Sequence, residues 1–154
     1  MNIYDVLDKL SISYEEITHD AVKTVKEAKE IENMIDGVPV KNLFLTDNEN
    51  SYYLIMLEAH KRADLKKITR LVNKKHLSFA SVNDLKDILK LDSGSVTPLG
   101  IINDRDNKVK IVIDKDLVGM KILVHPNVNT KTISINFDDL IMFIKYENHD
   151  YILM

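Results

Sequence analysis

Two apolar runs separated by a short polar segment constrain the fold of this chain more than any other feature. Residues 40–46 and 52–57 carry the aliphatic and aromatic side chains that strands favour, and residues 47–50 between them, Asp-Asn-Glu-Asn, have turn chemistry. A connection of four or five residues predicts a β-hairpin. Gly37 and Pro39 end a helix upstream and lead into the first strand. The fold must therefore contain two adjacent antiparallel strands.

Helical spacing of apolar residues predicts about five helices in the chain. The predicted helices comprise residues 2–10, a segment that starts at Thr24, residues 64–73, a segment that starts at Ser81, and residues 137–144. Thr24 followed by Glu27 has the spacing of a reciprocal N-terminal cap. The apolar residues of 25–35 are expected to form one buried stripe.

Further strands are predicted where short apolar runs lie between turn signals. These strands are residues 14–17, 99–102, 109–113, part of 117–124, and 132–135, and residues 78–80 are expected to be short and extended. Residues 103–107, Asn-Asp-Arg-Asp-Asn, would connect two of them as a plain hairpin turn. With six or seven strands in all, the chain is predicted to be α+β, a single domain over residues 1–154 with a mixed, mostly antiparallel β-sheet and packed helices.

The composition excludes several kinds of chemistry. A chain of 154 residues is long enough to bury a core of its own. It contains no cysteine, which removes disulfides, thiolate nucleophiles and thiolate metal sites. No basic leader and no apolar stretch of membrane-spanning length is present, so a soluble cytoplasmic protein without membrane contacts is expected. No histidine pair has ligand spacing, and no metal or other cofactor is assigned.

Positive charge is concentrated in one segment, although the formal net charge is -3. That net charge argues against a protein that coats DNA or other nucleic acid without specificity. Between His60 and His76 the single acidic residue is Asp64. The cations of this basic segment are Lys61, Arg62, Lys66, Lys67, Arg70, Lys74 and Lys75. They form either a solvated helix face or a local contact surface for one defined ligand.

The seven residues from Gly94 to Gly100, Gly-Ser-Val-Thr-Pro-Leu-Gly, are suited to bring main chain close to a ligand. Glycine leaves room for such an approach, and Pro98 fixes its own φ and has no amide donor. A loop of this kind can direct N–H groups toward a carbonyl or phosphate oxygen. The alternative interpretation is an ordinary turn that leads into a strand.

Lys41 and His125 are the most informative single side chains. Lys41 opens an otherwise apolar strand, so it either holds an anionic ligand group or protects a strand edge from pairing. His125 is the only histidine beside a proline and near two asparagines, whereas the other four are scattered. A surface or capping histidine is the alternative interpretation there.

Four segments together indicate a family. They are residues 41–45, Lys-Asn-Leu-Phe-Leu; residues 77–81, Leu-Ser-Phe-Ala-Ser; the glycine loop 94–100; and His125-Pro126 with Asn129-Thr130. In this order they resemble the YbaK-like aminoacyl-tRNA deacylases, which include the editing domain of bacterial prolyl-tRNA synthetases. The chain is most similar to the free-standing ProX or PrdX branch, and the resemblance extends over roughly its whole length.

The resemblance implies hydrolysis of the ester between a wrong amino acid and the terminal adenosine of a transfer RNA. Alanine attached to proline tRNA is the expected substrate, so the implied partners are the acceptor end of that mischarged tRNA and prolyl-tRNA synthetase. Carried over by position, Lys41 would orient the terminal nucleotide and Gly94 would direct its N–H to the ester carbonyl. Together with His125 they form the predicted catalytic set, and they are expected to share one pocket with His125 on its rim.

Other residues are predicted by the same resemblance to bind substrate. The substrate-binding set is Asn42, Ser95, Thr97 and Pro98. The set that would contact tRNA is Lys66, Lys67, Arg70, Lys74 and Lys75. If they meet phosphates, binding should weaken as salt rises.

The chemistry of the implied reaction suits a chain without cysteine or metal. An activated ester needs a positioned water and donors directed at the developing oxyanion, rather than a strong nucleophile. Selection is harder, because one or two methylenes change binding by only about 1 to 3 kcal/mol, so a second pocket would have to exclude proline. Two alternatives remain, a deacylase for cysteine on proline tRNA and a non-catalytic module that binds tRNA or a synthetase.

Overall fold

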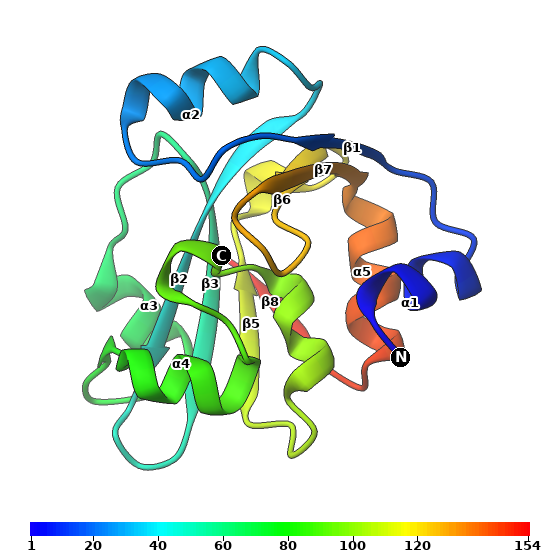
Figure 1. Ribbon diagram of the computed structural model, residues 1–154. Helices are drawn as coiled ribbons and strands as arrows, with labels where there is room; N and C mark the ends of the chain where they lie inside the picture. The colour runs from blue at the N-terminus through cyan, green and yellow to red at the C-terminus, as the bar shows by residue number, and fades with distance from the viewer.

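The computed structural model describes residues 1–154 and contains eight strands and five α-helices (Figure 1). The strands are β1 (Glu15–Thr18), β2 (Val38–Thr46), β3 (Tyr52–Glu58), β4 (Ser78–Phe79), β5 (Val109–Ile113), β6 (Lys121–Val124), β7 (Lys131–Asn136) and β8 (Tyr151–Leu153). The α-helices are α1 (Ile3–Lys9), α2 (Val25–Glu32), α3 (Leu65–Leu71), α4 (Val82–Leu89) and α5 (Phe137–Tyr146). Three short 3-10 segments are η1 (Ser93–Ser95), η2 (Pro98–Asn103) and η3 (Lys115–Leu117). The predicted α+β class is confirmed.

All eight strands belong to one mixed sheet in the order β1-β7-β6-β2-β3-β5-β8, with β4 paired to β2. The pairs β1·β7, β2·β3, β2·β4 and β6·β7 are antiparallel, whereas β2·β6, β3·β5 and β5·β8 are parallel. The predicted hairpin is confirmed as β2 and β3, with Leu45 opposite Tyr53. Four antiparallel pairs against three parallel ones make the sheet more evenly mixed than predicted.

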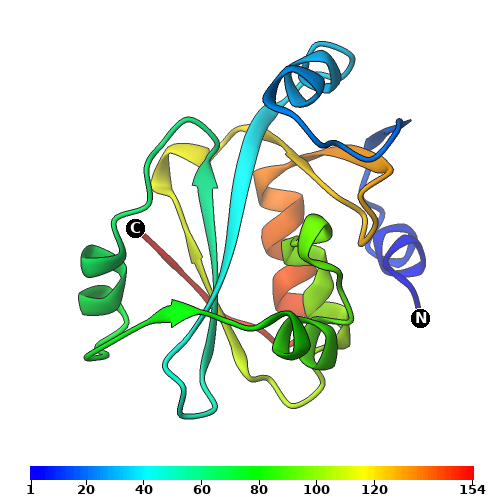
Figure 2. The same cartoon turned by 60° about the vertical axis from the view of Figure 1, so that its left-hand side comes forward.

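Strand β2 is fully paired on one edge only. On its other edge, β6 pairs with it at Val38 and Pro39, and β4 pairs with it at Leu45 and Thr46. No strand lies beside residues 40–44 on that edge. We call these five residues the open edge of β2, and Figure 2 shows this part of the strand between α2 and β4. The open edge is where other parts of the chain, or a ligand, can approach the middle of the sheet.

The two faces of the sheet bury separate apolar clusters. Ile68 of α3 packs on one face in a cluster that includes Leu45. Phe44 belongs to the larger cluster on the other face, to which α1, α4 and α5 contribute. Figure 2 shows α3 on one side of the sheet and α4 and α5 on the other. Because successive strand residues point to opposite faces, neighbouring side chains of β2 project alternately toward these two sides.

The prediction of a strand at residues 99–102 is wrong, because this segment is part of the 3-10 helix η2. Pro98 occupies its first turn, and the Thr97 side chain caps it by accepting from the Leu99 N–H. Residues 103–107 therefore do not form a hairpin turn. Asp104 instead accepts hydrogen bonds from the N–H groups of Lys108 and Val109, which start β5.

The buried stripe predicted for α2 is also wrong. No residue of α2 is buried, and Val25 is 77% exposed. The cap is half formed, because Thr24 accepts from the Glu27 N–H while the Glu27 carboxylate accepts from the Thr24 hydroxyl instead of a backbone donor. α2 thus lies over the sheet as a helix that contributes nothing to the core.

A buried ion pair joins the end of the chain to β5. His149 Nε2 lies 2.8 Å from Asp104 Oδ2, and both side chains are at most 2% exposed. Burial raises the pKa of the Asp104 carboxyl, but the hydrogen bonds from His149, Lys108 and Val109 outweigh it and leave that pKa below its ordinary value. Burial lowers the pKa of His149, and its bonds to Asp104 and the Glu147 carbonyl outweigh that effect and raise it.

No helix has the length and apolar character needed to cross a bilayer. The last strand, β8, is not among the strands expected from the sequence, and it pairs with β5 from Ile111 to Ile113.

Candidate active site

The three segments that the sequence singled out meet in space. The contacts run from Asn42 Nδ2 to the Val96 carbonyl (3.2 Å), from Thr97 Oγ1 to the His125 carbonyl (2.7 Å) and from Asn127 Nδ2 to the Leu99 carbonyl (3.5 Å). A Cβ placed on Gly94 would lie 3.4 Å from Asn129 Nδ2. The glycine loop is therefore held between the open edge of β2 and the segment that follows β6.

Three of the predicted substrate-binding residues belong to the glycine loop, and their side chains point into the protein. Ser95, Thr97 and Pro98 are all buried. The Thr97 hydroxyl donates to the His125 carbonyl and accepts from the Leu99 N–H, so its hydrogen-bonding capacity is used within the protein. None of the three lines the cavity described next. Their side chains are used inside the protein and set the shape of the loop.

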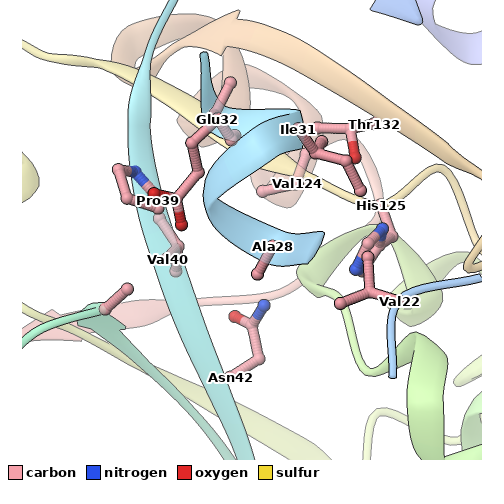
Figure 3. Close-up of a pocket in the computed structure, with 12 residues that line it drawn as sticks. Val22, Ala28, Ile31, Glu32, Pro39, Val40, Asn42, Val124, His125 and Thr132 are labelled. Carbon is pink, nitrogen blue, oxygen red and sulfur yellow. The ribbon is translucent and has the colours of Figure 1, made fainter. Parts of the chain in front are cut away.

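A cavity of about 250 Å³ lies between α2, β2 and the end of β6 (Figure 3). Most of its walls are aliphatic, with Ala28 and Ile31 contributed by α2. Its polar lining groups are Glu32, Asn42, His125 and Thr132. The sequence did not identify the α2 residues as cavity walls; the signal was their apolar spacing, which we assigned to a buried stripe.

Asn42 presents an unsatisfied acceptor at this cavity. Its Nδ2 donates to the Val96 carbonyl, and its Oδ1 is buried without a hydrogen-bond partner. A buried polar atom without a partner is costly, and a donor group from a ligand would satisfy it. A ribose hydroxyl or an α-ammonium group is such a donor.

His125 lines the cavity and is held in a defined orientation. Its Nδ1 lies 3.0 Å from the carbonyl oxygen of Lys131. Since a carbonyl oxygen can only accept, Nδ1 carries the proton, and the neutral ring keeps its lone pair on Nε2. The ring therefore has one free basic nitrogen next to the cavity, where Figure 3 shows it beside Val22.

Of the three residues predicted to share one pocket, His125 lines the cavity, whereas Lys41 and Gly94 are not among its lining residues. Lys41 precedes Asn42 in β2, so its side chain projects to the opposite face of the sheet. There its Nζ donates to the Lys61 carbonyl, and it does not line the cavity. Strand alternation gives the reason, because Lys41 shares the face of Leu45, toward α3, while Asn42 shares the face of Phe44.

The basic segment lines a separate hollow along α3. Four of the five predicted tRNA-contact residues, Lys66, Arg70, Lys74 and Lys75, surround it, and Lys67 does not. Lys74 is paired with Asp47 at 3.0 Å. Burial raises the pKa of Asp47, but the Glu49 and Ser51 N–H groups and Lys74 together lower it to about 2. Lys74 thus ties α3 to the β2–β3 hairpin.

The amino-acid sequence matches the model of a protein family. The family model described as an aminoacyl-tRNA editing domain matches residues 19–143. The chain belongs to this family. A solved structure has the same fold at low sequence identity. The crystal structure of a hypothetical protein superposes on this chain with a TM-score of 0.78 and 16% identity, and the match covers 98% of this chain and 96% of the other.

Curated relatives match nearly the whole chain. The prolyl-tRNA editing protein ProX of Acetoanaerobium sticklandii is 37% identical over 147 residues, which cover 94% of this chain and 90% of the relative. The mouse prolyl-tRNA synthetase associated domain-containing protein 1 is 31% identical over 155 residues, which cover 96% of this chain and 90% of the relative. The family predicted from the four sequence segments is confirmed.

Proposed function

We propose that this chain is a trans-editing aminoacyl-tRNA deacylase that hydrolyses alanine wrongly attached to proline tRNA. The observation that carries the proposal is the convergence of the glycine loop, Asn42 and His125 beside one small apolar cavity. Family membership and the printed name of the ProX relative support the reaction class. Residues 1–154 act in this proposal as one editing domain.

The reaction needs only a water molecule and groups that the chain provides. The water oxygen bonds to the ester carbonyl carbon, the bond from that carbon to the ribose oxygen breaks, and the proton of the water ends on the ribose oxygen. His125 Nε2 accepts the proton from the attacking water and returns it to the leaving oxygen. The Gly94 N–H stabilises the negative charge that develops on the carbonyl oxygen.

Selection against proline cannot rest on cavity volume alone. At roughly 30 Å³ for each water of liquid volume, a cavity of about 250 Å³ holds several waters and thus more than an alanyl methyl group. The shape set by Ala28 and Ile31 of α2 must do the rest, so closure of α2 on the acyl group is part of this proposal. The same geometry admits a cysteinyl ester, which keeps that specificity as the second candidate.

Lys41 and the basic segment would act on the RNA from the other face of the sheet. Lys41 lies near the open edge of β2 and would exchange its bond to the Lys61 carbonyl for a terminal phosphate oxygen. The cations of α3 would contact phosphates of the acceptor end, while the acyl group enters the cavity near Asn42. In this proposal the substrate crosses the open edge, and prolyl-tRNA synthetase is the source of the mischarged tRNA.

The test is hydrolysis of alanyl-tRNA(Pro), cysteinyl-tRNA(Pro) and prolyl-tRNA(Pro) by the purified protein. Rapid loss of the alanyl ester alone is expected. His125→Ala is expected to reduce its rate about 100-fold or more, the range of general acid–base catalysis. His60→Ala is the matched control, because the His60 ring is exposed and contacts Glu58.

Each other result has a defined meaning. Preference for the cysteinyl ester would move the specificity to the second candidate. Cleavage of none of the esters above the buffer rate would contradict the enzyme and favour a binding module. Cleavage that survives His125→Ala would remove His125 from the reaction and leave the function in place.

A further inference from the structure

A second hollow shares Asn42 with the cavity. It has a volume of about 210 Å³ and lies between β2, β4, the start of α4 and the glycine loop. Val96 of the glycine loop and Ser93 just before the loop line it, as do Leu43 and Phe44 of the open edge. Because Asn42 borders both hollows, the second hollow is a neighbour of the candidate active site.

Two large apolar side chains stand exposed on the wall of this second hollow. Phe79 of β4 is 62% exposed and Val82 of α4 is 66% exposed. Phe79 is the one phenylalanine among the exposed large apolar side chains of the chain. An aromatic ring that remains in water at the edge of a hollow is available to a flat apolar partner.

The basic segment immediately precedes β4 in the chain. β4 follows the basic segment after only His76 and Leu77, and the hollow along α3 is lined by cations that include Arg70 and Lys75. Phe79 pairs with Leu45 in the sheet, and paired residues share a face, so Phe79 lies on the side where α3 packs. The second hollow lies at the sheet edge and has lining residues from both faces, since Leu43 and Asn42 both border it. An exposed aromatic ring next to cations is the combination that binds single-stranded nucleic acid.

We propose that Phe79 is the platform on which the base of the terminal adenosine of the tRNA stacks, with Val82 contacting the base edge. This assignment rests on the proposed function, because it places the nucleoside that carries the ester. The base occupies the second hollow, the acyl group occupies the cavity, and the ribose between them lies at Asn42. The unpaired Oδ1 of Asn42 accepts from a ribose hydroxyl at that point.

The first experiment measures binding of two short RNAs, the trinucleotide CCA and the same molecule with an abasic third nucleotide. Wild-type protein is expected to bind CCA about 5- to 150-fold more tightly, which is the range for one stacked base. Phe79→Ala is expected to bring this ratio close to 1, and Phe79→Tyr is expected to preserve it. Met142→Ala is the control, since Met142 is an exposed apolar residue on α5.

The second experiment measures steady-state hydrolysis of alanyl-tRNA(Pro) by the same variants. Phe79→Ala is expected to raise KM by a factor similar to the decrease in CCA affinity, with kcat changed much less. If the role of Phe79 were merely structural, Phe79→Ala would also lower the thermal midpoint. The wild-type KM in Phe79→Tyr would then not be accompanied by an equal recovery of the thermal midpoint.

The outcomes separate this inference from the proposed function. If wild-type protein cleaves the alanyl ester and Phe79→Ala changes neither KM nor the CCA ratio, the stacking assignment is wrong and the deacylase stands. If wild-type protein cleaves no ester but still prefers CCA over the abasic RNA through Phe79, the deacylase fails and the base site stands. Equal binding of both RNAs by wild-type protein overturns the base site, and loss of synthetase association in Phe79→Ala would then assign the ring to a protein contact.

Discussion

Gly94 matters at the residue scale because, in the proposed reaction, its N–H must be reached by an ester carbonyl and a side chain there would stand in the way. A Cβ on Gly94 meets Asn129 Nδ2 at 3.4 Å, an ordinary contact, so Gly94→Ala is expected to fold with an unchanged thermal midpoint. We expect hydrolysis of alanyl-tRNA(Pro) to fall at least about 10-fold, because the added methyl group holds the carbonyl away from the N–H donor. Single-turnover rates measure this effect, and an unchanged rate would show that the Gly94 N–H does not face the ester.

The pair of Asp104 and His149 makes a pH prediction. The pKa of Asp104 is lowered from 3.8, so its stabilisation is present above pH 3.8 and is lost as the pH falls through the lowered value. The pKa of His149 is raised from 6.5, so its stabilisation is present below pH 6.5 and is lost as the pH rises through the raised value. The pair therefore contributes most between pH 3.8 and 6.5.

Urea unfolding of Asp104→Asn across this range tests the pair. Near pH 5 the variant is expected to lose about 3 to 5 kcal/mol of unfolding free energy, because a buried charge is left unpaired. The difference from wild type is expected to shrink as the pH rises from 6.5 to 9. Asp106→Asn, an exposed change in the same loop, is the control, and a difference that stays constant with pH would contradict the assignment.

At the scale of elements, α2 is the helix that the rest of the fold stabilises least, since it buries no residue. Thr24→Ala removes its N-terminal cap, which is worth about 1 kcal/mol. We expect amide hydrogen exchange in α2 to accelerate about 5-fold while the global thermal midpoint stays unchanged.

Ser81→Ala provides the matched comparison, because Ser81 caps α4 with the same kind of bond but α4 buries Leu85 and Leu89. This change is expected to lower the global stability by about 1 kcal/mol. If Thr24→Ala also lowers the global thermal midpoint, the stability of α2 contributes to the stability of the core, which would contradict this prediction.

The sequence predicts those elements whose pattern reflects packing against the core. The β2–β3 hairpin, α1 and α5 follow from apolar periodicity, and all three bury side chains in the structure. The segment 99–102 resembles a strand in sequence because a run of four apolar or small residues fits a strand and a 3-10 turn equally well. Strand β8 is not predicted because it has only three residues, which are too few to show an apolar periodicity, and it pairs with β5 alone.

The candidate site is predictable to a different extent. The segments that hold Asn42, Gly94 and His125 are identified correctly as neighbours in space. The position of Lys41 is not, because the resemblance assigns roles to residues while strand alternation decides the face on which they lie. The cavity walls from α2 could not be found, since a helix over a cavity and a helix over a core have the same apolar spacing.

At the scale of the whole molecule, charge is distributed so that an acidic protein has one cationic face along α3. The affinity for tRNA(Pro) that carries no amino acid is therefore expected to fall as salt rises. Changing Lys66, Lys67 and Arg70 to glutamine should reduce the slope of log affinity against log salt by about 0.7 to 0.9 for each phosphate that the variant no longer neutralises.

Filter binding over a series of salt concentrations measures this slope. The control changes three exposed lysines on other faces, Lys110, Lys115 and Lys145, to glutamine. An unchanged slope in the first variant, or an equal reduction in the second, would show that the basic segment is a solvated helix face.

The arrangement of α2 has a consequence for how such a molecule diversifies. Ala28 and Ile31 line the cavity without supporting the core. If the cavity holds the acyl group as proposed, substitutions there are expected to alter acyl preference at little cost in folding stability. The glycine loop and the open edge of β2 do not belong to α2, so substitutions in α2 leave their sequence unchanged. Acyl preference can thus drift among descendants of one scaffold while the binding of the RNA end is inherited intact.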